Sequence, residues 1–348
     1  MTAHAPERAA ALVMEGAPMT CLALVLASAC GALPNPEPAT VPARYEPPPA
    51  RPAPVQEPVS AAAPAPAPAP TPATVLPRTP DSGVAVAYVG GQPIDVGELL
   101  SQWLHQDSLQ VLEQLDHLVL GRLVVAEAGR LSVVADPARV EAAYRDAVAQ
   151  IEKRIQVRRP GVTFDRYVDE ALGLDPVRYR EFLRDEALRG LLAERVVRAW
   201  VLASEHTLAR VIVVKSDEDS GKVRAALDAG EPFEEVARRL SADGSAKDGG
   251  RVPPIVRSET VMGRLAFGTE IGKVGGPQYE KGAWLYLLVE ARPEPLEGAW
   301  PAIAEAVEKS LAERPVAELE VSQWKPAMAE RYQVDVTPLL RLAGQPTR

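Results

Sequence analysis

Proline is concentrated in one stretch of the chain, and this stretch limits what the first part of the sequence can fold into. Half of the 34 prolines lie between Pro34 and Pro80. Each proline fixes φ and removes a backbone hydrogen-bond donor, so neither a helix nor a sheet is expected there. Residues 31–82 are therefore predicted to be a disordered Pro/Ala-rich tether, which would reach on the order of 150 Å at about 3.1 Å per residue. We interpret it as a passive spacer, and a docking segment for a proline-binding partner is the alternative.

A short apolar run precedes the tether. Met19 to Ala29 has the length of a signal-peptide core, is too short to span a bilayer and ends in small side chains. Cys30 follows at once, and its surroundings resemble the lipobox of bacterial lipoproteins, although Ala27 stands where that motif usually has leucine. Residues 1–30 are thus predicted to be a signal peptide with a lipobox, and the resemblance implies a lipid on Cys30. A cleaved secreted protein and an uncleaved anchor are the alternatives.

Charge and cysteine content argue against several classes of function. The formal net charge of −9 argues against a nucleic-acid partner, because contacts to phosphates need clustered lysine and arginine. Both cysteines, Cys21 and Cys30, lie in the first thirty residues, so the rest of the chain can form neither a disulfide nor a thiolate metal site. It also lacks a phosphate-binding GxxxxGK motif and a grouping of ligands at metal spacing. We expect no cofactor and no metal.

Residues 83–203 have the pattern of a helical domain that follows a short strand. The strand begins near Val84, Gly90-Gly91 marks a tight turn, and Asp95 can cap the next helix. Apolar residues then recur at helical spacing. The predicted helices lie in Leu99 to Leu104, Leu112 to Ala126, Asp136 to Ile151, Phe164 to Leu172 and Val177 to Trp200.

The order of these motifs resembles the N-terminal domain of bacterial periplasmic chaperones of the SurA and PrsA type. The matching segments are the strand and turn at Val86 to Ile94, the helix at Val111 to Gly129 and the helix at Gly173 to Leu191. The resemblance covers residues 84–200. It implies a domain that holds unfolded segments of other proteins.

A second pattern predicts a small α+β unit over residues 204–292. The apolar run from Leu208 to Val214 predicts a buried strand, and two short helices are predicted after it. Ser241 to Gly250 is a polar, glycine-rich loop. The apolar run from Ala283 to Glu290 is the last strand. Together these segments predict an antiparallel sheet with helices.

This unit resembles the parvulin family of peptidyl-prolyl cis-trans isomerases. Its most specific segment is the loop region, in which seven positions are in register with the family: Gly230, Phe233, Ala237, Ser241, Asp243, Gly249 and Gly250. By resemblance, Asp243 is the polar group of the active-site loop. Phe267, Met262 and Val252 are expected to line a socket for the proline ring. Ordinary core packing of Phe267 and Met262, and a turn role for Asp243, are the alternatives.

Two departures from the parvulin pattern bear on catalysis. Family members usually have one histidine in the first strand and one in the last, and these positions are assigned to Val211 and Trp284 here. We expect both to contact substrate without acting as catalytic groups. The nearby His206 is interpreted as a surface linker residue. A binding-only chaperone with a degenerate isomerase unit is therefore the alternative to an active enzyme.

The end of the chain is predicted to return to the helical domain. Residues 293–340 contain helical patterns from Trp300 to Ala312 and from Pro315 onward, and the ending around Trp324 and Met328 looks similar to the C-terminal helix of the SurA and PrsA type. The expected fold class is α+β, with a helical domain built from both ends of the body and an inserted parvulin-like unit.

The resemblances together imply a folding factor for exported proteins. Its expected partners are unfolded or partly folded exported chains, and a membrane through the lipid on Cys30. The expected location is the periplasm, and Gly31 after the cysteine favours the outer membrane by resemblance to lipoprotein sorting rules.

Overall fold

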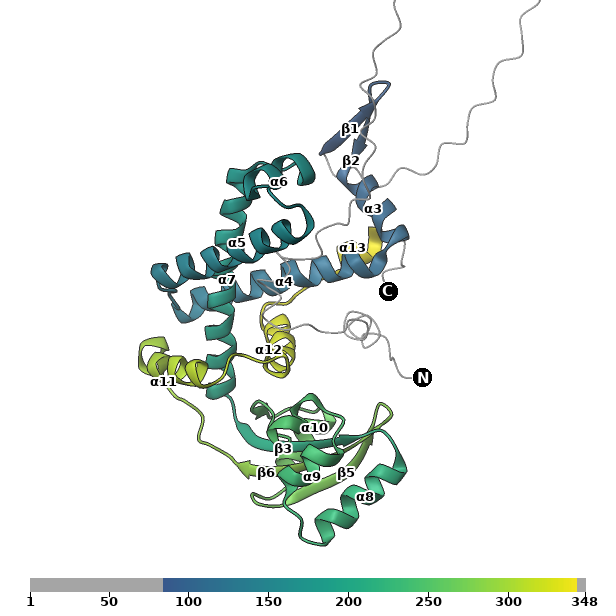
Figure 1. Ribbon diagram of the computed structural model, residues 1–348, viewed down its shortest axis with the longest axis vertical. Coiled ribbons are helices and arrows are strands. Elements are labelled where there is room, and N and C mark those ends of the chain that lie inside the picture. Colours follow the sequence, from purple (N-terminus) through teal and green to yellow (C-terminus); the bar gives the residue numbers. More distant parts are fainter. Residues whose placement is uncertain (1–83, 343–348) are drawn as a thin grey trace, which may run out of the picture. The chain divides into compact units, whose positions relative to one another are not determined.

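The computed structural model describes residues 84–342, which form two compact units (Figure 1). The larger unit holds residues 109–335. The smaller one holds residues 84–108 and 336–342, and each is described by itself. The predicted signal peptide, Cys30 and the predicted tether lie outside the described residues.

The smaller unit begins with a hairpin where the sequence predicted a single strand. Strand β1 (Ala85–Val89) pairs antiparallel with β2 (Gln92–Asp95), and Gly90 and Gly91 supply positive φ angles of 57° and 79° at the turn. Asp95 caps helix α3 (Val96–Gln106), as predicted, because its Oδ1 accepts the Glu98 N–H at 2.8 Å. The last element of this unit is α13 (Thr337–Leu342).

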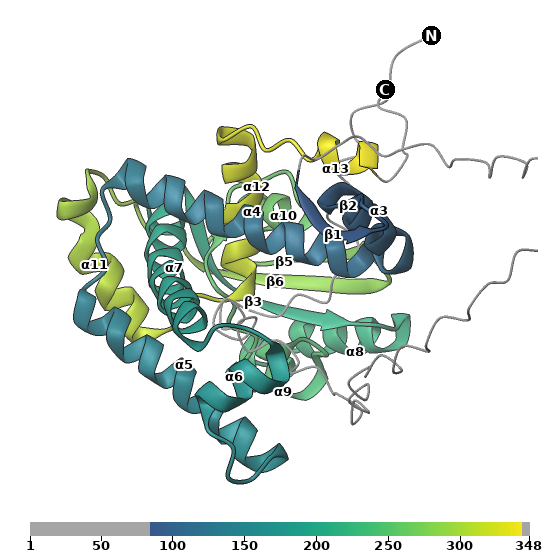
Figure 2. The same cartoon turned by 90° about the horizontal axis from the view of Figure 1, so that it is seen from above.

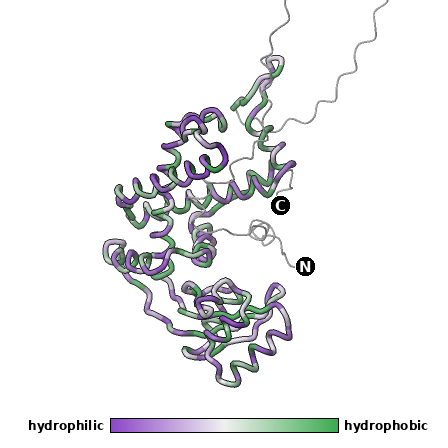
Figure 3. The backbone as a smooth tube through the Cα atoms, viewed as in Figure 1, coloured by the Kyte–Doolittle hydropathy of each residue, from purple (hydrophilic) through white to green (hydrophobic). Residues whose placement is uncertain are grey.

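Four helices form the first part of the larger unit, and their ends follow from the sequence. Asp136 and Asp175 cap two of them with proline in the first turn, which has no amide hydrogen to leave unpaired. Gly173 ends another helix in the left-handed conformation at φ 66°. Figure 3 shows hydrophobic and hydrophilic residues interleaved along these helices. They are α4 (Ser108–Leu131), α5 (Pro137–Arg158), α6 (Phe164–Leu172) and α7 (Pro176–Ala203).

The two C-terminal helices α11 (Trp300–Glu313) and α12 (Glu318–Arg331) pack against α7 (Figure 1). The side chains of Trp324 and Met328 are fully buried in the same core as Val196 and Val197 of α7. The helical domain is therefore built from both ends of the body, as predicted. Among residues 84–342, no helix has the length and apolar character required to cross a membrane.

A buried ion pair joins helix α12 to helix α7. Arg198 of α7 bonds both carboxylate oxygens of Glu320 at 2.8 and 3.1 Å, and both side chains are almost fully inaccessible. The same guanidinium donates to the carbonyls of Ser310, Arg314 and Pro315 in the α11–α12 connection. Because its donors are satisfied on every side, burial of this charge is tolerated.

The parvulin-like unit is a four-stranded antiparallel sheet in the order β4-β3-β6-β5. Figure 2 labels β3, β6 and β5 of this sheet. Helices α8 and α9 cover one face, where Val223 and Val236 join the core, and α10 covers the other, where Ala266 does. Helix α10 and strand β5 were not predicted. The elements are β3 (His206–Val214), α8 (Asp217–Asp228), α9 (Phe233–Leu240), β4 (Ile255–Val256), α10 (Val261–Gly268), β5 (Val274–Glu280) and β6 (Ala283–Ala291).

Candidate functional site

The α10 face of the sheet carries an apolar cluster, here called the apolar socket. Four of the residues expected to contact substrate come together in it: Val211 and Val252 are buried, and Met262 and Phe267 are half-buried against them. The other buried members are Ala209, Ile255, Ala266, Leu285, Leu287 and Val289.

Trp284 does not join the other four. Side chains alternate between the faces of a strand, and Trp284 packs on the α8 face against Tyr286 and its neighbours. Its indole N–H donates to the Asp217 carboxylate at 2.7 Å, and its ring lies 4.9 Å from that of Tyr279. The next residue, Leu285, points to the socket side in its place. The two-residue period of Leu285, Leu287 and Val289 was the signal that could have identified it.

Phe267 is held between two arginines. The guanidinium carbons of Arg257 and Arg292 lie 4.2 and 5.5 Å from the centre of its ring. Arg257 is fixed in turn by two bonds to Glu205 at 2.5 and 2.6 Å, and these hydrogen bonds lower the pKa of the Glu205 carboxyl. Arg292 donates to the Ala266 and Phe267 carbonyls at the end of α10. The ring is thus fixed at the margin of the socket by groups that also end the helix.

Asp243 caps a short 3₁₀ turn, η1 (Gly244–Asp248). Its Oδ1 accepts the Ser245 amide at 2.9 Å and the Ser245 hydroxyl, which is the turn role that the Asp-Gly sequence suggested. Among the described residues, its Oδ2 has no hydrogen-bond partner. The carboxylate therefore has one oxygen engaged in the fold and one free.

The loop that carries Asp243 is tied to strand β3 at Val213. The Ala242 amide donates to the Val213 carbonyl at 2.7 Å, and the Val213 amide donates to Ser241 Oγ at 3.1 Å. Val213 packs against the socket cluster. These bonds hold the loop that carries Asp243 against β3, the strand that supplies Val211 and Val213 to the socket cluster.

The double glycine closes the same loop against β3. The Gly250 carbonyl accepts the Val211 amide at 2.7 Å, and Gly250 has a φ of 79°. A Cβ at this position would lie 2.3 Å from the Val211 carbonyl oxygen. The close approach of loop and strand therefore requires glycine here.

His206 is buried, so the expectation of a surface linker residue was wrong. It begins strand β3, is 3% exposed, and its Nδ1 lies 2.8 Å from the Ser204 carbonyl. The strand starts two residues earlier than its apolar run suggested, which takes the imidazole into the fold.

Helix α12 covers the β4 edge of the socket. Leu319 packs against the cluster, and the Gln323 side chain accepts the Val256 amide at 2.7 Å and donates to the Pro254 carbonyl at 3.1 Å. The socket is thus bounded by the helical domain on one side and by the Asp243 loop on another.

The chemistry available at this site is limited to apolar contact and one carboxylate. In the described part of the chain, no group of three histidine, cysteine or acidic side chains could hold a metal ion. The residues at the socket centre, Val211 and Leu285, carry no polar atoms in their side chains. The partly exposed side chains of Met262 and Phe267 offer apolar contact, and the Asp243 loop offers one carboxylate.

No protein-family model matches the chain. In sequence, the chain is 26% identical over 123 residues to the foldase protein PrsA of Clostridium botulinum; the match covers 33% of this chain and only 37% of that protein. The structure of PrsA from Bacillus anthracis is 14% identical, with 64% of this chain and 99% of that chain covered and a TM-score of 0.30. A SurA-like chaperone structure from Campylobacter jejuni is 17% identical, with coverages of 76% and 100% and a TM-score of 0.25. Over that partial match in sequence, the chain is similar to a foldase of the PrsA type, which agrees with the PrsA-type resemblance that its motifs indicated.

Proposed function

We propose that this protein is a folding factor that binds proline-containing segments of unfolded exported chains and speeds X-Pro rotation in its parvulin-like unit. The observation that carries the proposal is the apolar socket with the Asp243 loop at its edge. The name of the Clostridium botulinum relative, a foldase, supports the proposed folding function.

The proposed catalysis requires no covalent chemistry. Rotation about a peptide bond is opposed by a barrier of about 18 to 20 kcal/mol, because the planar amide is conjugated. A socket that holds the proline ring among Val252, Met262 and Phe267, and that keeps water from the amide, favours the twisted and less conjugated form. Since the side chains of Val211 and Leu285 offer no hydrogen bond to that form, the proposed rate enhancement is small.

A binding-only chaperone is the second candidate. The observation that favours it is the pair of aliphatic side chains, Val211 and Leu285, at the socket centre, together with the engagement of Asp243 as a cap. In this case the socket would be a second contact for client chains beside the helical domain.

Cis-trans conversion of a proline tetrapeptide, followed by a protease-coupled assay, tests the isomerase. Asp243→Asn keeps a side chain that caps nearly as well but removes the charge, whereas Asp243→Ala removes both. We expect Asp243→Asn to lower the rate enhancement by about tenfold, which corresponds to about 1.4 kcal/mol of transition-state stabilisation. The matched control is Asp228→Asn, an exposed carboxylate at the end of α8.

The outcomes separate the two candidates. Normal activity in Asp243→Asn with a loss only in Asp243→Ala would give Asp243 a purely structural role. No acceleration by the intact chain would favour the binding-only chaperone. That candidate predicts suppression of aggregation of an unfolded envelope protein, retained after deletion of residues 204–292.

We further propose that the protein works in the periplasm, held by a lipid on Cys30. The lipobox resemblance and the apolar run before it support this location, and the unfolded chains that a foldase serves would pass through the same compartment.

A further inference from the structure

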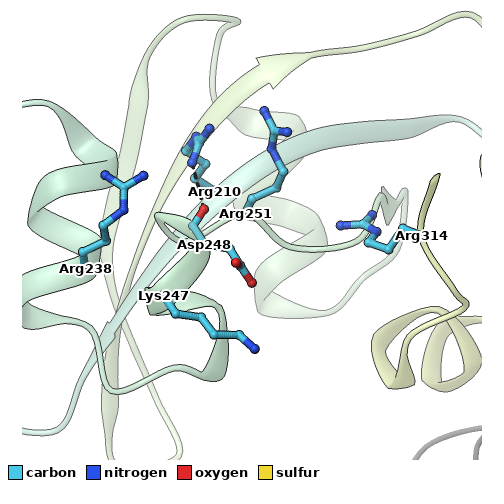
Figure 4. Close-up of a pocket in the computed structure, with 6 residues that line it drawn as sticks. All are labelled: Arg210, Arg238, Lys247, Asp248, Arg251 and Arg314. Carbon is cyan, nitrogen blue, oxygen red and sulfur yellow. Dashed lines mark hydrogen bonds between the residues drawn. The ribbon is translucent and has the colours of Figure 1, made fainter.

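The surface of the larger unit has a cavity with a volume of ≈ 540 Å³. Figure 4 shows its lining, in which five cationic side chains surround one carboxylate. The lining residues are Arg210, Arg238, Lys247, Asp248, Arg251 and Arg314. We call this the basic cavity.

The basic cavity is on the opposite side of the sheet from the socket. Side chains on β3 alternate between the two faces of the sheet, so Arg210 lies on the same face as Ile212, which packs against α8 and α9. Val211 lies on the other face, in the socket. Arg238 is carried by α9 itself. Arg314, at the end of α11, closes one side. Arg314 also reaches the socket side, because its Nη1 lies 3.5 Å from the Val252 carbonyl.

Most of the positive charge in the cavity is not neutralised by the protein. Arg210 is paired with Glu290 at 2.6 Å, and Arg251 reaches the same carboxylate at 3.6 Å. Within residues 84–342, no carboxylate oxygen lies within 4.0 Å of the charged nitrogens of Arg238, Lys247 or Arg314. Like charges that converge without a counter-ion favour binding of an anion.

The pKa of Arg314 reflects the excess of positive charge around it. Burial lowers the pKa of the Arg314 guanidinium, the charge of Glu320 opposes that shift, and the positive charges of Arg198 and Arg251 add to it. An anion in the cavity would relieve the repulsion between these arginines.

The backbone of Gly249 lies against the side chains of Arg210 and Arg238. A Cβ on Gly249 would lie 2.7 Å from the Cβ of Glu234, 2.8 Å from Arg210 Nη1 and 3.3 Å from Arg238 Nη2. Arg210 also donates to the Gly249 carbonyl at 2.9 Å. The glycine therefore leaves the space that the two guanidinium groups occupy.

We propose that the basic cavity binds a carboxylate-rich segment of a polypeptide. A volume of ≈ 540 Å³ is in the range of sites that take several groups at once. Arginine forks match carboxylates in a bidentate geometry. The carboxylate of Asp248 repels any anion that comes close to it, but it can accept a backbone N–H, and a peptide supplies such a donor beside its carboxylates, whereas a fully ionised phosphate supplies none. The net charge of −9 disfavours a nucleic acid.

This proposal depends on the proposed function in one respect: the acidic segment would come from a client chain. The test uses the full chain and a fluorescent peptide of alternating glutamate and aspartate without proline, so that it does not depend on isomerisation. Fluorescence anisotropy would report its affinity. A peptide of glutamine and asparagine with the same length serves as the ligand control.

The variant carries Arg238→Glu and Lys247→Glu, both exposed positions. We expect at least about a tenfold loss of affinity for the acidic peptide, which corresponds to about 1.4 kcal/mol. The matched control, Arg224→Glu with Lys273→Glu, changes the net charge equally at exposed positions outside the cavity and should bind like the unaltered chain. Binding should also weaken with added salt.

Three results with the peptides and variants would overturn the proposal, and a fourth comes from competition with phosphate. They are no binding of the acidic peptide, equal binding of the amide peptide, and equal loss in the two charge-reversal variants. Displacement of the peptide by an equimolar amount of inorganic phosphate would assign the cavity to a phosphate ligand and would also overturn it. Thermal melts of each variant would show that the fold is intact. Because the peptide lacks proline, failure here is distinguishable from failure of the isomerase.

Discussion

Glu127 is a buried acid on which the joint between α4 and α12 depends. Its side chain is 1% exposed and bonds Arg130 and Arg331, and it accepts the Tyr332 hydroxyl at 2.8 Å. Burial alone would raise the pKa of Glu127, but the hydrogen bonds from Arg130 and Tyr332 and the charges of Arg331 and Arg130 lower it to about 2. The carboxylate is therefore stabilised as an anion in the folded state.

This pKa predicts a pH dependence of stability. Because the folded pKa of about 2 lies below the ordinary value of 4.5, the stabilisation by Glu127 is complete above pH 4.5 and is lost as the pH falls toward 2. Glu127→Gln should lower the free energy of unfolding at pH 7 by on the order of 2 kcal/mol, since the arginine partners are half exposed. Urea unfolding from pH 7 to pH 3 would check this.

The two unfolding curves should converge as the pH falls, because the variant has no carboxylate to protonate. Glu113→Gln, at an exposed position of the same helix, is the matched control and should follow the unaltered chain. A gap between Glu127→Gln and the unaltered chain that stays constant with pH would contradict the prediction.

Individual residues of the socket were predictable where strand period and motif agreed. Val211, Val252, Met262 and Phe267 lie together as the parvulin resemblance implied. The prediction that Trp284 contacts substrate came from motif spacing alone. Along β6, side chains alternate between the two faces of the sheet, and it is the next residue, Leu285, that faces the socket. Partners that lie far along the chain, such as the Arg257–Glu205 pair over Phe267, leave no signal in a single sequence.

At the scale of elements, the contact of the double-glycine loop with β3 holds the Asp243 edge of the socket. We predict that Gly250→Ala lowers the free energy of unfolding by about 3 kcal/mol, because it combines a strained positive φ with a clash against the Val211 carbonyl. Gly221→Ala is the control, since this glycine lies in helix α8 and no atom lies within 4 Å of the position that its new methyl group would take. It should stabilise by about 0.5 to 1 kcal/mol.

Denaturant midpoints of both variants, measured on the full chain, would check the pair. An unchanged midpoint in Gly250→Ala would mean that loop and strand can separate without loss of stability, and the placement of Asp243 would then lack its support.

Elements with clear caps and helical periodicity were predictable, and others were not. Helices α6 and α7 begin and end close to their predicted residues, and α5 begins as predicted, because Asp-Pro starts and a glycine end are local signals, whereas α5 continues to Arg158, beyond the predicted Ile151. Strand β5 (Val274–Glu280) contains two glycines and a proline, and it becomes a strand only through pairing with β6. Such tertiary pairing overrides local propensity.

At the scale of the whole molecule, the chain leaves the helical domain at the end of α7 and returns to it through α11 and α12. The Arg198–Glu320 pair joins segments that the parvulin-like insertion separates in sequence. The ending around Trp324 predicted this return by resemblance, but the ion pair that holds it could not be foreseen from either segment alone.

The proposed attachment of the folded body to a membrane through a lipid on Cys30 can be tested at the scale of the whole molecule. A diacylglyceryl group on this cysteine would supply two acyl chains, and each buried methylene contributes about 0.8 kcal/mol, so attachment would be stable. We predict that the full chain, expressed in a bacterial host, sediments with membranes and incorporates a labelled fatty acid, and that Cys30→Ala abolishes both. Cys21→Ala, nine residues earlier in the apolar run, is the matched control and should keep both properties. Label that persists in Cys30→Ala would contradict the lipobox assignment, whereas loss of label with retained sedimentation would indicate an uncleaved apolar anchor instead.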